Sequence, residues 1–353
     1  MISKYAIVGS AKETINSQSQ YSEIKMALNK LGMNETTLEN SDCLIFMNYN
    51  KKWYKKYKKL GKSLENLVLI RLEPIAVLPI QYRKSIERKF GLIINPGRIH
   101  KNNLKSDFIG YPYSYNLNPS LPNINDPKLS DILSQLIKND IFDYDNWCNR
   151  ENKIVFISAN KVSPTSNSNY KLRRKIAKQM SSTEIDIYGD LWNSSLYKKI
   201  CHRLVVGFYT LKTGFFPNIV EIYGGLFSKY SNYVSAPLDK HIVIEKYKFS
   251  LVIENSFEYC SEKLFDAIIN GSIPIYVGPK NSQIELPENL YFWCNGSVDE
   301  IRNFVSTITP KKVDDMLKSM DNFIQSKNFE DNWASEKVYS RISNDIYKFW
   351  NYK

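Results

Sequence analysis

Residues 247–278 read YKFSLVIENSFEYCSEKLFDAIINGSIPIYVG, and the pattern of apolar residues in this stretch indicates the fold class. An apolar run ends at Ile253 and is followed by a polar loop. From Ser261 the apolar residues recur at the spacing of a helix, which runs to Asn270, and a second apolar run follows over 273–277. Strand, helix and strand in this order predict a βαβ unit with parallel strands. We therefore expect an α/β fold.

Polar residues gather where the first strand of this unit ends and where its helix begins. Glu254 and Asn255 follow the strand, Ser261 is a typical N-cap residue, and Glu262 and Lys263 fall in the first helical turn. In open parallel sheets, ligands bind outside the carboxyl ends of strands, against helix N-termini. A cation in the first turn interacts unfavourably with the helix macrodipole, at a cost of roughly 0.3 kcal/mol or more. A bound anion would turn this unfavourable interaction into a favourable one. The pattern indicates either an anion site or an ordinary βαβ unit with a surface lysine.

Similar alternation of apolar runs and amphipathic stretches extends over most of the chain. Further strands are expected at 5–8, 43–47, 67–72, 92–94, 154–157 and 185–188, and helices at 21–31, 79–90, 128–138, 170–180 and from Val298 onward. A chain of 353 residues is long for one core. We expect two Rossmann-like domains facing a cleft, over 1–150 and 151–335, and a C-terminal helix over 336–353 that packs back on the first domain.

The net charge of +12 indicates an anionic partner. Part of the excess lies in one cluster, formed by Lys51, Lys52, Lys55, Lys56, Lys58 and Lys59. This cluster is interpreted as a solvated helix face, with contact to an acidic glycan or to an anionic membrane as the alternative. No nucleic-acid-binding motif accompanies it, so we expect no nucleic acid partner.

The five cysteines form no CxxC pair and the three histidines are dispersed, which argues against a disulfide framework and against a zinc site. The DxD-like Asp143–Asp145 follows no strand and is interpreted as loop. We expect no metal site, and motifs of dehydrogenases, NTPases, esterases and zincins do not occur in the sequence. Because the start is not typical of a signal peptide and no apolar run could span a bilayer, a reduced, cytoplasmic protein is expected.

The segment 247–278 resembles the donor-binding signature of glycosyltransferase family 10, the α-1,3/4-fucosyltransferases, in its bacterial type. That signature has the form YKF-x-L-x-(F/I)-EN(S/T), then (D/E)-Y-x-(T/S)-EK(L/I), then (I/V)-P-(I/V)-x-x-G. The matching residues are Tyr247, Lys248, Phe249, Glu254, Asn255, Ser256, Tyr259, Glu262, Lys263, Pro274 and Gly278. Ser261 stands where threonine is usual, and the linker before Tyr259 is short.

The resemblance implies a GT-B fold and a set of residues that bind the nucleotide sugar. In this set Glu262 binds fucose or ribose hydroxyls, Lys263 binds the diphosphate, and Asn255 and Tyr259 contact the sugar donor. The remaining members that the resemblance implies are Glu254 and Tyr188.

A second likeness to the family lies upstream, where a strand is followed by a Ser/Asn-containing loop, a basic helix from Tyr170 and the strand I-D-I-Y-G that ends at Gly189. The resemblance implies that an arginine early in this helix contacts the donor phosphates. Arg173 fits this position and Arg174 is its rival, with two solvated arginines as the alternative. Arginine suits the role because its planar fork bonds two phosphate oxygens and keeps its charge.

Glu73 follows a predicted buried strand and precedes Pro74. Family 10 places a glutamate at such a strand end, which implies that Glu73 is the base of an inverting transfer. The alternative is a structural glutamate paired with Arg71 or another cation.

Taken together, the resemblance implies inverting transfer of L-fucose from GDP-β-L-fucose to an oligosaccharide hydroxyl, in α-1,3 or α-1,4 linkage. No cofactor or metal is obligatory, and stimulation by a divalent cation stays open. The O-antigen of lipopolysaccharide is one candidate acceptor. Another nucleotide sugar as donor and a non-catalytic binder of anionic glycan or RNA are the alternatives. Bacterial members often meet the inner membrane through a basic C-terminal region. The stretch Ile342–Lys353, with Ile346, Phe349, Trp350 and Tyr352, is expected to pack back across the interdomain cleft, with weak contact to a membrane as the alternative.

Overall fold

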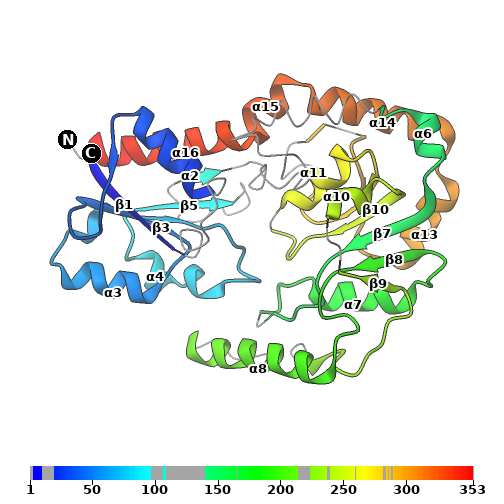
Figure 1. Cartoon of the computed structure of the whole chain (residues 1–353), viewed down its shortest axis with the longest axis horizontal. Helices are drawn as coiled ribbons and strands as arrows, with labels where there is room; N and C mark the ends of the chain where they lie inside the picture. Colours follow the sequence, from blue (N-terminus) through cyan, green and yellow to red (C-terminus); the bar gives the residue numbers. More distant parts are fainter. Residues whose placement is uncertain are drawn as a thin grey trace. The chain divides into compact units, whose positions relative to one another are not determined.

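The structure, a computed structural model, describes residues 3–9, 20–96, 106–108, 140–163, 165–213, 223–236, 239–258, 260–280, 284, 286, 287 and 289–352. The chain divides into two compact units, which are described separately (Figure 1). Unit 1 comprises Met1–Asn116, Asn123–Leu129 and Lys327–Lys353. Unit 2 comprises Leu117–Pro122 and Ser130–Ser326.

Unit 1 contains a parallel sheet in the order β2-β1-β3-β4-β5-β6. Its strands are β1 (Lys4–Gly9), β2 (Asn34–Glu35), β3 (Cys43–Met47), β4 (Leu67–Ile70), β5 (Leu92–Pro96) and β6 (Ser106–Phe108). Its helices are α2 (Gln20–Lys30), α3 (Lys51–Lys59), α4 (Lys84–Glu87), α15 (Lys327–Trp333) and α16 (Ser335–Asn351), with 3-10 turns at Leu64–Asn66 and Pro79–Tyr82. Every residue of β3 and β4 is buried, because these central strands pack apolar side chains on both faces.

The C-terminal helix α16 packs against α2 and contributes to the core of unit 1 (Figure 1). Ile342, Ile346 and Trp350 are buried there, and the Trp350 indole donates to the Asn66 carbonyl at 3.1 Å. The membrane contact suggested for this helix is therefore wrong for Ile346 and Trp350. Tyr352, at the end of the helix, is 74% exposed.

Unit 2 contains a second parallel sheet, in the order β12-β11-β10-β7-β8-β9. Its strands are β7 (Glu151–Ile157), β8 (Ile185–Tyr188), β9 (Tyr233–Ser235), β10 (Tyr247–Ile253), β11 (Ile273–Val277) and β12 (Phe292–Trp293). Its helices include α6 (Tyr144–Cys148), α7 (Tyr170–Gln179), α8 (Leu196–Thr213), α10 (Lys240–Ile244), α11 (Glu262–Ile269), α13 (Val298–Thr307) and α14 (Pro310–Ile324). The pairing of Ile253 with Val277 brings the carboxyl ends of β10 and β11 together.

Unit 2 begins earlier than the expected boundary at residue 151. Trp147 of α6 packs edge-on against Phe249, with ring centroids 5.6 Å apart, and its indole donates to the Lys248 carbonyl at 3.0 Å. Arg150 donates to the Asn270 carbonyl at 2.8 Å. These contacts attach the segment before β7 to the second sheet, so it belongs to unit 2.

Three helices differ from the sequence prediction or lie outside its test. The stretch 79–90 is interrupted at Arg83, which has an extended backbone between the 3-10 turn and α4. The helix expected over 128–138 lies outside the described residues. Helix α8 was not predicted. Among the helices that the structure describes, none combines the length and the apolar content that a bilayer span requires.

Candidate active site

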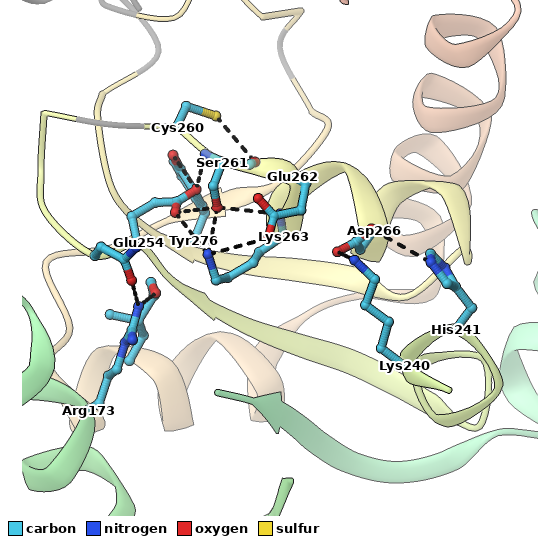
Figure 2. Close-up of polar contacts among 12 residues, drawn as sticks. Arg173, Lys240, His241, Glu254, Cys260, Ser261, Glu262, Lys263, Asp266 and Tyr276 are labelled. Carbon is cyan, nitrogen blue, oxygen red and sulfur yellow. Dashed lines mark hydrogen bonds and ion pairs between the residues drawn. The ribbon is translucent and has the colours of Figure 1, made fainter. Parts of the chain in front are cut away.

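Glu254 is the centre of a polar cluster at the carboxyl end of β10 (Figure 2). Its side chain is fully buried, and it accepts hydrogen bonds from the Ser261 backbone N–H at 2.7 Å and from the Ser261 hydroxyl at 2.6 Å. Burial raises the pKa of Glu254 above its ordinary value, although Lys263 and the two hydrogen bonds from Ser261 oppose this shift. The carboxylate therefore fixes the start of α11 relative to the end of β10.

The glycine that ends the signature allows this close packing. A Cβ atom on Gly278 would lie 2.8 Å from Cγ of Glu254 and 2.5 Å from the ring of Tyr276. Both distances are shorter than van der Waals contact, so any side chain at 278 would displace Glu254 or Tyr276. The backbone after β11 can approach the cluster only because residue 278 is glycine.

Lys263 points back from the first turn of α11 into the cluster (Figure 2). Its ammonium donates to the Ser261 hydroxyl at 2.8 Å and lies 3.8 Å from the carboxylates of both Glu254 and Glu262. Burial lowers the pKa of Lys263, but Glu262 and Glu254 outweigh this effect, and its pKa is raised. The side chain is 26% exposed, so part of it faces solvent at the carboxyl edge of the sheet.

The two rival arginines of α7 lie in different surroundings. Arg173 stacks 4.8 Å from the Tyr170 ring and donates from Nη2 to the Ile253 carbonyl at 2.5 Å and to Asn255 Oδ1 at 2.9 Å. Arg174 instead donates to the Lys161 carbonyl at 3.1 Å. The structure thus brings Arg173 to the cluster and turns Arg174 away from it.

Arg173 is nevertheless only 3% exposed, and Nε of this side chain is buried without a hydrogen-bond partner in the described part of the chain. Burial lowers the pKa of its guanidinium, and Tyr170 and Glu254 oppose that shift. In this state Arg173 orients Asn255 and supplies positive charge beneath the cluster. Direct contact of Arg173 with phosphate stays a prediction.

The other predicted site residues of unit 2 are less closely grouped. Glu262 is 19% exposed beside Lys263. Tyr188 ends β8, where its hydroxyl lies 3.0 Å from that of Tyr247. Tyr259 lies outside the described residues. Their predicted contacts with the nucleotide sugar stay predictions.

A pocket of about 140 Å³ adjoins the cluster beside α11. Glu262 and Lys263 contribute to its wall, together with Asp266, one turn further along α11, and Lys240 of α10. Sequence reasoning missed Asp266, a buried carboxylate that Lys240 holds at 2.6 Å (Figure 2). The sequence signal for Asp266 was a charged residue on the otherwise apolar face of a helix, because a buried charge usually requires a partner.

The predicted base, Glu73, lies in unit 1 beyond the end of β4 and is partly exposed. Its backbone carbonyl accepts from Gln81 and from the Tyr82 hydroxyl, each at 2.9 Å, which fixes the turn. The buried guanidinium of Arg71 bonds Glu87 at 2.8 Å. The role of Glu73 as base stays a prediction.

Some of the remaining candidate residues make contacts that stabilise the fold. The lysines of α3 are exposed, and Lys56 pairs with Glu39 at 2.8 Å. Asp143 caps α6 by accepting from the Asn146 N–H at 3.0 Å, so the DxD-like stretch begins a helix. Within the described ranges, no group of three His, Cys, Asp or Glu side chains is arranged to hold a metal ion.

The two parallel sheets and their helices form a GT-B fold. An α1,3-fucosyltransferase crystal structure is similar over 99% of this chain and 90% of its own, with a TM-score of 0.53 and 13% identity. A crystal structure of an α1,3-fucosyltransferase with GDP-fucose has a TM-score of 0.52; the match covers 98% of this chain and 89% of that one, with 14% identity. The crystal structure of HepE of Anabaena with UDP and glucose has a TM-score of 0.54 and 10% identity. The match covers 99% of this chain and 100% of that one.

Residues 218–340 match the model of the glycosyltransferase family 10 (fucosyltransferase) C-terminal domain. A fucosyltransferase-like protein of Arabidopsis thaliana is 39% identical over 64 residues, which are 18% of this chain and 12% of that protein. The aligned part is thus about an eighth of the curated relative's length. This region of the chain is accordingly similar to the C-terminal domain of glycosyltransferase family 10.

Proposed function

We propose that the chain transfers L-fucose from GDP-β-L-fucose to a hydroxyl of an acceptor glycan, with inversion and in α-1,3 or α-1,4 linkage. The observation that carries this proposal is the position of Lys263. It is a charged, partly exposed ammonium at the start of α11, at the carboxyl edge of the sheet and within the family 10 region. Helix N-termini at this edge of parallel sheets bind phosphate groups.

The contacts of Lys263 support an exchange of partners on binding of the sugar donor. Its carboxylate neighbours lie 3.8 Å away, beyond hydrogen-bond distance, so they attract the ammonium without bonding it directly. A diphosphate offers shorter charge-assisted hydrogen bonds and would also accept from N–H groups of the first turn. In this proposal Glu262, freed from Lys263, binds a hydroxyl of the fucose or the ribose.

The chemical step is a single displacement at the anomeric carbon. The acceptor oxygen forms a bond to this carbon as the bond to the diphosphate oxygen breaks, and GDP leaves with the electron pair. Lys263 and the helix N-terminus neutralise the charge that develops on the leaving group. Glu73 takes the proton of the acceptor hydroxyl. Because the protein's own cations fill this role, the scheme has no obligatory metal ion.

Mass analysis of products tests the proposal. The full chain is incubated with GDP-β-L-fucose and either lactosamine-type, galactose-type or O-antigen acceptors, and linkage is then assigned by NMR. Transfer of one deoxyhexose is expected for at least one acceptor. A thermal-shift panel with GDP-mannose and UDP-sugars is run in parallel, and stabilisation by a UDP-sugar but not by GDP-fucose would refute the choice of donor.

A further inference from the structure

Helix α3 gathers its lysines on one side and its aromatic residues on the other. The exposed lysines, called the α3 lysine face, are Lys51, Lys52, Lys55, Lys56, Lys58 and Lys59. At about 3.6 residues per turn, they occupy roughly half of the helix circumference. Tyr57 is buried in the core of unit 1, and Trp53 and Tyr54 pack against that core. The α3 lysine face therefore points away from the core, into solvent.

The charge of this face is not balanced within the described part of the chain. Lys56 pairs with Glu39 at 2.8 Å, but among the described residues the other five lysines have no ion-pair partner. The first turn contains Lys51 and Lys52 and no acidic residue, so both charges interact unfavourably with the helix macrodipole. Lysines four positions apart, such as Lys51 and Lys55, also repel one another. An external anionic surface would turn these unfavourable charges into favourable ones.

A lysine that follows α4 extends the face. Nζ of Lys89 donates to the Tyr49 hydroxyl at 3.5 Å and lies 4.6 Å from the centroid of the Tyr54 ring. Burial lowers the pKa of Lys89, and the nearby charges of Lys51 and Lys58 lower it further. The fold thus holds one more cation beside two like charges.

We propose that the α3 lysine face docks on an anionic phospholipid surface, with α3 lying parallel to that surface. Single-stranded nucleic acids bind through aromatic rings that stack on bases. The rings beside this face are already covered, because Lys56 lies 5.4 Å from the centroid of the Trp53 ring and Lys89 lies over Tyr54. The face also contains no arginine, whose planar fork recognises carboxylate or phosphate groups at fixed positions. Flexible lysines suit the diffuse charge of lipid headgroups.

The start of α3 lies close to the predicted base. Met47, which ends β3, pairs with Ile70, which ends β4, and Glu73 follows β4 at the same edge of the sheet. The Gln81 side chain accepts from the Tyr49 N–H at 3.2 Å and donates to the Glu73 carbonyl at 2.9 Å. Docking would therefore hold Glu73 near the membrane surface, where a lipid-linked acceptor glycan could reach it. This consequence rests on the proposed function, whereas the docking itself does not.

The test is co-sedimentation of the full chain with phosphatidylcholine vesicles, with and without phosphatidylglycerol, at low and high salt and without any sugar nucleotide. Wild type is expected to bind only the vesicles that contain phosphatidylglycerol and to be released by salt, because the contact is electrostatic. The triple variant Lys52→Gln/Lys55→Gln/Lys59→Gln should bind at least about tenfold more weakly, since each lysine near an anionic surface contributes roughly fivefold.

The triple variant Lys171→Gln/Lys175→Gln/Lys178→Gln is the matched control. These lysines are exposed at helical spacing on α7, and their replacement removes the same charge from the chain. This variant should bind within about twofold of wild type, because charges far from the contact are screened. Equal losses in the two triple variants would assign binding to net charge and overturn the inference, as would unchanged binding of the α3 variant. So would wild type that binds heparin or poly(U) but no vesicles.

A second measurement needs no variant. Wild type is acetylated with a water-soluble N-hydroxysuccinimide ester, with and without vesicles that contain phosphatidylglycerol, and the modified lysines are mapped by mass spectrometry. Lys55 and Lys59 should lose most of their reactivity on the vesicles, whereas Lys175 should react as before. Equal reactivity of Lys55 and Lys59 with and without vesicles would contradict docking through α3.

Discussion

Nη2 of Arg173 lies 2.9 Å from Oδ1 of Asn255, so a side chain of α7 holds the amide that follows β10. The same nitrogen bonds the carbonyl that ends the strand. Two elements at the carboxyl edge of the sheet are thereby tied together by one guanidinium.

Arg173→Lys should reduce affinity for GDP by about tenfold or more. Lysine keeps the charge but loses the planar guanidinium, whose Nη2 donates to both acceptors, and hydrogen bonds to charged groups contribute about 1.5–3 kcal/mol. Isothermal calorimetry with GDP measures the effect. Arg174→Lys, one residue further on the same helix, is the control and should leave affinity within about twofold. A larger loss in Arg174→Lys would reverse the assignment.

Glu73→Gln should lower turnover by about 10²–10⁴-fold and leave binding of GDP-fucose unchanged, because general bases contribute in this range and act on the acceptor. Transfer rates and calorimetry on the same preparation separate the two effects. Glu87→Gln removes the carboxylate that pairs with Arg71 and controls for a change in local charge. Normal turnover in Glu73→Gln would remove this residue from the mechanism.

Ile346→Ala should destabilise unit 1 by about 2–5 kcal/mol, since the deleted methyl groups leave a cavity in a core where this side chain is fully buried. Urea unfolding followed by circular dichroism measures the loss. Tyr352→Ala, close by but 74% exposed, should change stability by less than about 0.5 kcal/mol. Similar stability of both variants would show that α16 is not part of the core.

The ion pair between Arg302 and Glu184 predicts a dependence of stability on pH. Arg302 donates at 2.6 Å, and this bond lowers the pKa of Glu184 from 4.5 to about 2. A carboxylate with a lowered folded-state pKa stabilises the protein above its unfolded pKa, and that contribution is lost as pH falls from about 4.5 towards 2. Because both side chains are partly exposed, Arg302→Ala should cost only about 0.5–1 kcal/mol at pH 7.

Unfolding of wild type and Arg302→Ala at several pH values checks this dependence. The difference in free energy of unfolding should be constant above pH about 5 and shrink below it. Lys337→Ala, which removes an ion pair with an N–O distance of 3.9 Å, is the control. A difference between wild type and Arg302→Ala that stays constant down to pH 3 would contradict the assignment.

Local sequence was sufficient for elements whose apolar residues face the core. The expected strands at 43–47, 185–188 and 273–277 coincide with β3, β8 and β11, and α11 begins after the predicted cap Ser261. Gly271 ends that helix with a positive φ of 60°, as expected of a residue after the C-cap. These features follow from short-range pattern and capping, which a sequence displays directly.

Features that depend on distant partners were not accessible from sequence. Helix α8 was missed because its buried residues are polar and bond carbonyls some twenty to thirty positions away. The ion pair of Asp266 requires Lys240, which lies close to Asp266 only in the folded protein. For Lys263, the pattern indicated a cation at a helix start, but the contacts with Glu254 and Ser261 arise from the turn between β10 and α11.

In the proposed reaction, Lys263 holds the diphosphate of the sugar donor. Calorimetric titration of GDP-β-L-fucose into wild type, Lys263→Met and Lys153→Met tests it most directly. Lys153 is the matched control, because it is 32% exposed and paired with Asp186 at 3.3 Å but lies on β7 away from the carboxyl edge. The account predicts a loss of about 10–100-fold in affinity for Lys263→Met alone. Equal affinities of wild type and Lys263→Met, or equal losses in the two variants, would contradict it.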